Sequence, residues 1–222
     1  MTTITLTFDN GPDPDVTPDV LKTLNRRRIK STFFVLGEKL RDRRKLAERA
    51  HDEGHWIGNH TFTHLVPLGM SAESGIAASE IVRTEALVGD LAHRRRLFRP
   101  FGGGGLLDKR LLNREALDYL CREHFTCVLW NVIPEDWARP DGWVDRALEL
   151  SFAKAHALVV LHDLSTGAMR NLDRFIGMAL DRGATFQQDF PRDCVPVECG
   201  RIVEPIEAYL METVTRDLAP AS

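Results

Sequence analysis

Short apolar segments alternate with helical segments along most of this chain, and this alternation constrains the fold more than any other feature. Apolar segments of strand length are expected at residues 4–8, 31–36, 55–60, 95–101, 125–132, 157–162 and 183–188. Between them, one helix is expected to start at Thr17–Pro18 and another to end at Gly54, followed by helices at 71–93, 108–123, 142–155 and 166–182. Strands that are separated by helices usually pair in parallel. The sequence therefore predicts an α/β fold with parallel strands.

The chain has no composition break or linker, so residues 1–222 are predicted to form a single domain. The motifs described below fall within about residues 3–187, and residues 188–222 form a C-terminal extension. A helix is expected at about residues 204–216. It would either cover a face of the fold or form a homodimer contact.

Charge and composition exclude several classes of function. The net charge is -3, and the arginine runs 26–28 and 94–96 are expected to be solvated surface, so no nucleic-acid partner is predicted. No leader segment or apolar stretch of about 20 residues is recognisable, and no membrane association is expected. The four cysteines lack metal-ligand spacing and are expected to be reduced thiols. The expected location is the cytoplasm.

Polar residues follow the predicted strands at the points where the strands end. Parallel β/α folds place their chemistry at the carboxyl ends of the strands. The sequence therefore predicts a site at this edge, built from side chains that follow different strands: Asp9, Asn10, His60, Arg99, Asn131, His162 and Asp163.

His60 and His64 are four residues apart, which on a helical turn would place both imidazoles on one face. This spacing suits two ligands of a zinc-like ion. Surface or helix-capping histidines would show the same spacing. Asp9 is a candidate general base or third ligand, although Asp-Asn-Gly-Pro is also a common turn sequence.

Arg99 ends one predicted strand and is expected to pair with Asp9. The glycine run that begins at Gly102, after Phe101, either offers backbone N–H groups to an oxyanion or forms a flexible loop. His162 is a candidate general acid. The alternative is a histidine whose hydrogen bonds are satisfied at the N-terminus of a helix.

Asp136 and Trp137 supply a carboxylate and a flat apolar wall for a substrate. Tryptophans also pack in ordinary cores, so Trp137 is either a platform for a sugar ring or a core residue.

Five short motifs in this order resemble those of the polysaccharide deacetylase family, the NodB homology domain of carbohydrate esterase family 4. They are TFDNGP at residues 7–12, HTFTH at 60–64, RPFG at 99–102, IPEDW at 133–137 and LVVLH at 158–162. The resemblance implies a distorted (β/α)7 barrel with parallel strands that removes acetyl groups, most often N-acetyl, from a carbohydrate. It also implies a divalent metal ion, with zinc as the expected metal.

Carried over motif by motif, the resemblance makes Asp9 the base, His162 the acid and Arg99 the residue that orients Asp9. His60, His64 and Asn10 would be the metal ligands. Phe101, Gly102, Asp136 and Trp137 would contact the substrate or its oxyanion.

Three positions depart from the family pattern. Asn10 replaces a carboxylate, so weaker metal binding is expected. Ile133 replaces the aspartate that charges the acid histidine, so the pKa of His162 is expected to be lower than in a typical member, unless Asp136 or Asp163 substitutes for it. The third motif has Phe-Gly-Gly at residues 101–103 in place of the Pro-Tyr pair of the pattern, which remodels one substrate wall.

The leading hypothesis is a metal-dependent deacetylase of a soluble acetylated sugar. Two alternatives stay open. One is a hydrolase of a non-sugar small amide, and the other is a carbohydrate-binding member that has lost catalysis.

Overall fold

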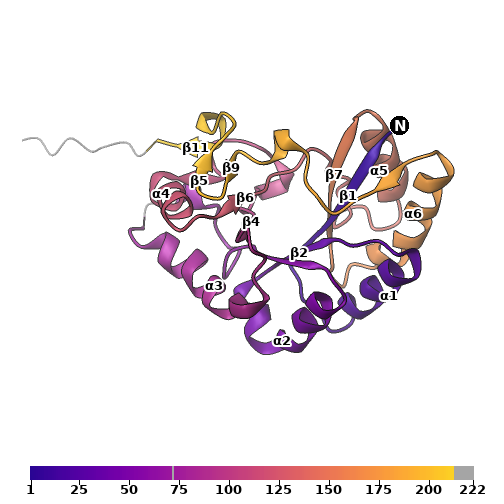
Figure 1. Cartoon of the computed structure of the whole chain (residues 1–222), viewed down its shortest axis with the longest axis horizontal. Helices are drawn as coiled ribbons and strands as arrows, with labels where there is room; N and C mark the ends of the chain where they lie inside the picture. The colour runs from indigo at the N-terminus through magenta and orange to yellow at the C-terminus, as the bar shows by residue number, and fades with distance from the viewer. Residues whose placement is uncertain (72, 213–222) are drawn as a thin grey trace, which may run out of the picture.

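A curved sheet of mostly parallel strands forms the centre of the computed structural model, which describes residues 1–71 and 73–212. Six parallel strands lie in the order β6-β4-β3-β2-β1-β7, and β8 pairs with the start of β1. Their bounds are β1 Thr3–Asp9, β2 Thr32–Val35, β3 Trp56–Asn59, β4 Leu97–Phe98, β6 Thr126–Cys127, β7 His156–His162 and β8 Thr185–Phe186. The sheet curls into a half-barrel, which confirms the expected α/β class and is consistent with a distorted (β/α)7 barrel (Figure 1).

The pairing of β1 with β7 fixes the geometry of one edge of the sheet. The two strands are in register over their whole length, from Thr3 opposite His156 to Asp9 opposite His162. A parallel bridge between Val132 and Val159 also joins the segment after β6 to β7. Because parallel strands end at the same edge, the residues at the ends of β1 and β7 are brought close together.

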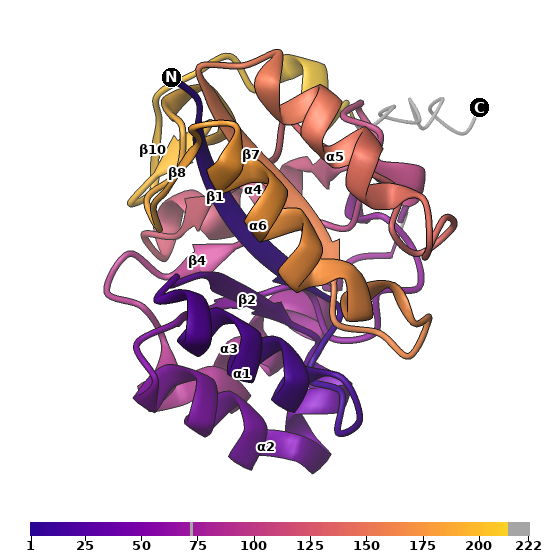
Figure 2. The same ribbon diagram turned by 90° about the vertical axis from the view of Figure 1, so that its right-hand side faces the viewer.

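Helices lie on the outside of the curved sheet. They are α1 Thr17–Arg27, α2 Gly37–Asp52, α3 Arg83–Val88, α4 Arg114–Arg122, α5 Trp143–Phe152 and α6 Leu172–Asp181. Figure 2 shows α5 and α6 side by side over β1 and β7, with α1 and α2 below them. Within the described ranges, no helix has the length and apolar character needed to cross a membrane.

Strand alternation divides the apolar core into two parts. Ile4, Leu6 and Phe8 belong to the cluster that packs under α1, α5 and α6. In β7, Leu158 and Val160 belong to a second cluster inside the curve of the sheet. Successive side chains of a strand point to opposite faces, so a buried strand needs apolar residues on both.

Two of the expected helices differ from the observed ones. The segment predicted as a helix at 71–93 contains a π-helical stretch, Ala78–Val82, followed by α3 and a 3₁₀ turn at Gly89–Leu91. The helix predicted at 108–123 begins only at Arg114, after the short strand β5 at Leu112–Asn113. The Asn113 side chain accepts a hydrogen bond from the Ala116 N–H, and this cap sets the helix start.

The prediction of a helix at residues 204–216 is wrong over the described residues. Residues 188–212 instead form β9 Val197–Glu198, β10 Arg201–Ile202, a 3₁₀ turn at Glu207–Tyr209 and β11 Leu210–Met211, and residues 213–216 lie outside the described part. β9 pairs with β6 and β11 with β5, so the extension completes sheet edges.

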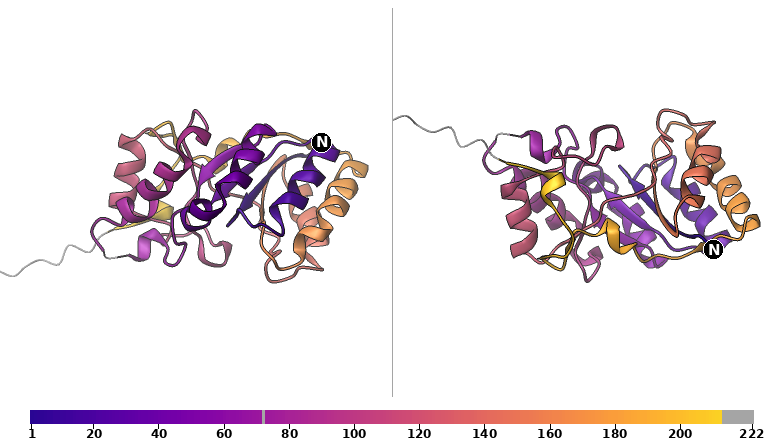
Figure 3. Two further views of the ribbon diagram at one scale, coloured as in Figure 1. Left: turned by 90° about the horizontal axis from the view of Figure 1, so that it is seen from below. Right: turned by 90° about the horizontal axis from the view of Figure 1, so that it is seen from above.

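The N-terminus and β11 lie at opposite ends of the long axis (Figures 1 and 3). A single domain over residues 1–222 and a homodimer both stay predictions, and the helix expected to form the dimer contact is not present at 204–212.

Substitution of Trp143 tests the packing between α5 and the region before α6. Its side chain is fully buried, and its indole N–H donates to the Ala168 carbonyl oxygen at 2.9 Å. We expect Trp143→Ala to lower the free energy of unfolding by about 3–5 kcal/mol, since it leaves a cavity and an unpaired carbonyl. Urea denaturation measures this. Leu180→Ala, at an exposed position of α6, is the control and should change stability by less than about 0.5 kcal/mol.

Candidate active site

A cavity of about 240 Å³ opens at the carboxyl edge of the sheet. It brings together most of the residues that the sequence singled out. Arg99 and Asp136 do not line it and lie behind it, fully buried. The prediction for Asn131 is wrong: its side chain donates to the His156 carbonyl and accepts from the Leu158 N–H, at the start of β7 and not at its carboxyl end. The lining residues are Asp9, Asn10, His60, His64, Pro100, Phe101, Gly102, Gly104, Gly105, Trp130, Ile133, Trp137, Val160, His162 and Leu164.

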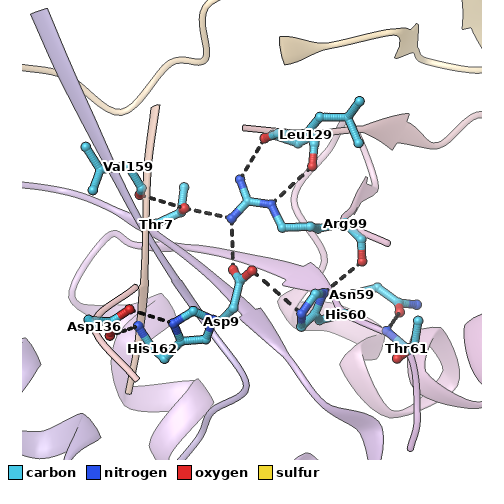
Figure 4. Close-up of polar contacts among 11 residues, drawn as sticks. Thr7, Asp9, Asn59, His60, Thr61, Arg99, Leu129, Asp136, Val159 and His162 are labelled. Carbon is cyan, nitrogen blue, oxygen red and sulfur yellow. Dashed lines mark hydrogen bonds and ion pairs between the residues drawn. The ribbon is translucent and has the colours of Figure 1, made fainter. Parts of the chain in front are cut away.

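Asp9 is a buried carboxylate at the end of β1, and Arg99 is its partner (Figure 4). Arg99 Nη1 donates to Asp9 Oδ1 at 2.8 Å and to Thr7 Oγ1 at 2.7 Å. The rest of the guanidinium donates to the carbonyl oxygens of Val128 and Leu129, both at 3.1 Å. The expected pairing of Arg99 with Asp9 is therefore present, and it leaves Asp9 Oδ2 facing the pocket side.

His60 is held in one tautomer by its environment. Its Nδ1 lies 2.8 Å from the Arg99 carbonyl oxygen, which can only accept, so the proton is on Nδ1. Nε2 then carries a lone pair and lies 3.6 Å from Asp9 Oδ2. Burial lowers the pKa of His60 to about 3, which keeps the ring neutral.

The His60 and His64 rings lie together, with centroids 4.8 Å apart, although no helical turn connects them. Thr61 and His64 instead have positive φ values of 69° and 56°. The predicted proximity is present, while its expected helical basis is wrong. Burial, followed by the nearby His60, lowers the pKa of His64 to about 3.

Glu80 supports this loop, and the sequence analysis missed it. Its carboxylate accepts hydrogen bonds from the backbone N–H groups of Phe62 and Thr63 and from the Thr63 hydroxyl, all at 2.9 Å. Glu80 is 8% exposed and lies in the π-helical stretch. An acidic residue in an otherwise helical pattern gives no signal of such a contact, because the contact spans 17 residues or more.

Asn10 occupies the turn after β1 in a left-handed conformation, with φ 70°. Lys39 Nζ donates to its carbonyl oxygen at 2.7 Å, and the Leu36 N–H donates to the Gly11 carbonyl at 3.0 Å. Asn10 lines the pocket. Its side-chain oxygen Oδ1 is buried and has no hydrogen-bond partner. A buried amide oxygen without a partner costs free energy unless a ligand satisfies it.

The donors at this side of the pocket fit a metal ion. They are the free Nε2 of His60, the neutral ring of His64 and the unpartnered Oδ1 of Asn10. Neutral imidazoles and amide oxygens are known metal ligands. Across residues 1–71 and 73–212, no three His, Cys, Asp or Glu side chains are grouped to hold an ion, so this set depends on the amide.

His162 lies at the end of β7 on the other side of Asp9, and Asp136 orients it (Figure 4). Asp136 Oδ1 accepts from His162 Nδ1 at 2.8 Å, and Oδ2 accepts from the His162 backbone N–H at 2.9 Å. Burial opposes the charged form of His162, but the hydrogen bond and charge of Asp136 outweigh it, so the pKa of His162 is raised above its ordinary value. Of the two carboxylates that could substitute for the one missing at position 133, Asp136 is the one that contacts the histidine. A pKa lower than in a typical member stays a prediction.

The placement of Asp136 also corrects its predicted contact with substrate. Asp136 is fully buried behind the histidine and does not line the pocket. The other predicted walls do line it. Phe101 packs on the His64 ring at a centroid distance of 3.7 Å, and Trp137 meets His162 edge-on at 4.8 Å.

Gly102 is placed where no larger residue fits. A Cβ at this position would lie 2.6 Å from the Trp130 ring, and the Trp130 indole N–H donates to the Gly105 carbonyl at 3.0 Å. Ile133 packs against Gly105, where a Cβ would lie 2.9 Å away. The pocket wall is therefore apolar on this side, and the sequence analysis did not assign Trp130 to it.

Asp163 is a buried carboxylate beside the pocket, and it packs on the turn after β1. Its Oδ2 accepts from the Thr17 hydroxyl, and a Cβ on Gly11 would lie 2.2 Å from this carboxylate. Oδ1 has no partner. Burial raises the pKa of Asp163 to about 7, so the group changes charge near neutrality.

Comparisons with known proteins place this geometry in a family. The model of the polysaccharide deacetylase family matches residues 1–119, and the matched part contains the first three motifs. The chain belongs to the polysaccharide deacetylase family. The resemblance seen in the sequence is confirmed, and the expectation of a hydrolase that acts on carbon–nitrogen bonds is confirmed at the level of the family.

Several relatives of this chain have names that describe their substrates. A chitooligosaccharide deacetylase of Bradyrhizobium is 33% identical over 163 residues, which are 71% of this chain and 69% of the relative. A peptidoglycan-N-acetylglucosamine deacetylase of Bacillus cereus is 30% identical over 82% of this chain and 65% of its own. A solved deacetylase with substrate is 27% identical, with a TM-score of 0.69 over 84% of this chain and 88% of that one.

The dependence of the His162 pKa on Asp136 can be tested directly. We expect Asp136→Asn to lower the pKa of His162, because the variant loses the carboxylate charge that raises it. NMR titration of the imidazole, in protein treated with chelator, measures the value. Asp141→Asn, at an exposed position, should leave it unchanged. An unchanged pKa in Asp136→Asn would contradict the assigned contact.

Asp163 should make stability depend on pH. Its pKa is about 7 in the folded chain and near 3.8 when exposed, so the folded state binds the proton more tightly. Stability is therefore expected to fall as pH rises from about 4 to about 7. In Asp163→Asn this part of the fall should disappear, as measured by urea denaturation across that range. Asp118→Asn, an exposed control, should keep it.

Proposed function

We propose that this chain removes the acetyl group from an N-acetylated carbohydrate by hydrolysis. The observation that carries the proposal is the placement of Asp9 and His162 in one pocket, each with a buried partner on its far side. A carboxylate base and a histidine acid, facing a common space, are what the hydrolysis of an amide needs. The names of the relatives support an acetylated sugar as the substrate class.

Asp9 is the proposed general base. Arg99 holds Oδ1, so Oδ2 is the oxygen that would take a proton from the attacking water. Arg99 also donates to Thr7 Oγ1, and this second contact holds the guanidinium that binds Asp9 Oδ1.

His162 is the proposed general acid. Its Nδ1–H is committed to Asp136, so Nε2 is the nitrogen that would give a proton to the leaving amine. The raised pKa of His162 favours the protonated form that this step needs.

His60, His64 and Asn10 are proposed to hold a divalent ion, with zinc as the expected metal. When bound, the ion supplies a Lewis acid that polarises the acetyl carbonyl. The role of the chain is to keep both imidazoles neutral and to present the amide oxygen without a competing partner. An amide brings no charge, so binding is proposed to be weaker than with a carboxylate at position 10.

Phe101, Gly102 and Trp137 are proposed to contact the substrate. The aromatic rings offer flat apolar faces of the kind that pack on sugar rings. The backbone at Gly102 runs along the pocket and is the proposed donor to the oxyanion.

A second candidate function is the hydrolysis of a small amide that is not a sugar. The apolar wall formed by Ile133, Trp130 and Leu164 favours it, because this wall offers few hydrogen bonds to hydroxyl groups. A carbohydrate-binding member without catalysis is the third candidate, and the uncharged Asn10 is the feature that favours it.

Acetate release from tri-N-acetylchitotriose tests the proposal. We expect release by the wild type, and a loss of at least about 100-fold in kcat/KM in Asp9→Asn and in His162→Gln, since each removes a proton-transfer group. Asn25→Asp, at an exposed position away from the pocket, is the control. If metal-loaded protein releases acetate neither from this substrate nor from other N-acetyl sugars, the proposed function is contradicted.

Metal content is a separate readout of the same site. Elemental analysis after dialysis without chelator should find about one zinc-like ion per chain, bound more tightly in Asn10→Asp. His60→Ala should lose the ion. If the wild type is empty and Asn10→Asp is filled, the third candidate function would take the place of the first.

A further inference from the structure

Exposed apolar side chains gather on two loops beside the pocket. Leu65 is 78% exposed and Leu106 is 56% exposed, and Val66, Met70 and Leu107 are also exposed. We call these five residues the apolar rim. Isolated exposed leucines are ordinary, but a group of them on neighbouring loops marks a surface that contacts an apolar ligand or partner.

The apolar rim is continuous with the pocket along the chain. His64 lines the pocket and Leu65 directly follows it, while Gly104 and Gly105 line the pocket and Leu106 directly follows them. The loops that carry the rim therefore leave the pocket mouth at the carboxyl ends of β3 and β4, which are neighbours in the sheet.

The two loops also contact one another on both sides of the rim. At the pocket, the His64 and Phe101 rings pack at 3.7 Å. Farther along, the Gly69 N–H donates to the Arg110 carbonyl at 2.9 Å. Leu65 and Val66 on one loop, and Leu106 and Leu107 on the other, lie between these two contacts along the chain, and Met70 directly follows Gly69. The contacts therefore hold the two loops that carry the rim next to one another.

Outside the proposed reaction centre, the described residues that line the pocket include few polar side chains. Asp9 is held by Arg99, His162 by Asp136, and the Trp130 indole by Gly105. Among the described lining residues outside the proposed reaction centre, the indole N–H of Trp137 is the side-chain donor that has no hydrogen-bond partner. The pocket can thus hold one reacting sugar, but it has few side chains to bind the hydroxyl groups of further sugars.

From this arrangement we infer that the substrate is amphiphilic: an acetylated sugar that carries an apolar group, such as an alkyl chain, which lies on the apolar rim. This inference rests on the proposed deacetylation and adds the chemistry of the rest of the substrate. Contact with the rim removes apolar surface from water on both partners, which favours binding of the apolar group.

Two substrates that differ only in the apolar group test the inference. Methyl and octyl 2-acetamido-2-deoxy-β-glucoside are compared for acetate release below the micelle concentration of the octyl compound. We expect kcat/KM for the octyl compound to be at least about tenfold higher, mainly through a lower KM, because partial burial of the chain already supplies this factor. Equal values in the wild type would overturn the inference while leaving the deacetylation intact. Failure of both compounds to release acetate would count against the proposed function instead.

The double variant Leu65→Ser/Leu106→Ser identifies the rim as the source of the preference. Both positions are exposed, so folding should not depend on them. The octyl-to-methyl ratio should fall to near one in this variant, whereas Leu180→Ser, at an exposed apolar position on α6, should retain it. A ratio unchanged in the double variant would overturn the assignment.

Binding of octyl β-glucoside, which has no acetyl group, gives a readout that does not depend on catalysis. Binding of its alkyl chain should shift the NMR resonances of the rim leucines at concentrations where the glucoside is monomeric. The double variant should bind it at least about tenfold more weakly. Sedimentation with neutral phosphatidylcholine vesicles should leave the wild type in solution. Sedimentation that the double variant abolishes would make a lipid surface the occupant and overturn the inference.

Discussion

The buried guanidinium of Arg99 is the interaction on which the rest of the site depends. It is fully buried, and its hydrogen bonds reach Asp9 and Thr7 on β1 and the carbonyl oxygens of Val128 and Leu129 after β6. A buried charge is tolerated only when it is paired and its donors are satisfied, and breaking such a pair costs about 3–5 kcal/mol. The arginine therefore does two things. It permits a carboxylate inside the barrel, and it ties together strands from opposite sides of the curve.

The acid half of the site has the same construction with different residues. His162 is in register with Asp9 across β7 and β1, and its buried carboxylate partner comes from the loop after β6. The sequence resemblance led us to expect this carboxylate at position 133, where this chain has isoleucine. Asp136 takes its place, so Ile133 is free to form part of the apolar wall. One substitution thus changes the lining of the pocket, while the histidine keeps a charged partner.

The proposed metal-binding side of the pocket relies on loop conformation more than on charge. Asn10, Thr61 and His64 have positive φ values, and each is fixed by contacts from elsewhere in the chain or by neighbouring turns. Lys39 holds the backbone of Asn10, and Glu80 holds the backbone beside His64. These supports come from α2 and from the π-helical stretch. Loops of this kind can position ligands because contacts with the surrounding structure fix the loop conformation.

Much of the fold and most of the site could be predicted from the sequence, because both depend on local patterns. Apolar segments and helix signals gave the parallel strands, and polar residues after Phe8, Phe98 and Leu161 marked the edge where the site lies. The helix expected at 204–216 failed because local helical propensity competes with strand pairing, and β9 and β11 find partners distant in sequence. The helical basis for the histidine pair failed for a similar reason: Glu80 bonds the loop in another conformation.

The sequence by itself determined which residue types end the strands, and hence the candidates Asp9, His60, Arg99 and His162. Only the tertiary structure decided how they pair: Asp136 behind His162, Arg99 behind Asp9, and Asn10 with an unpartnered oxygen in the pocket. The physical reason is that burial and hydrogen bonding across the barrel set the charge and aim of each group. Those contacts join residues 26 to 90 positions apart, a separation at which sequence spacing carries no information.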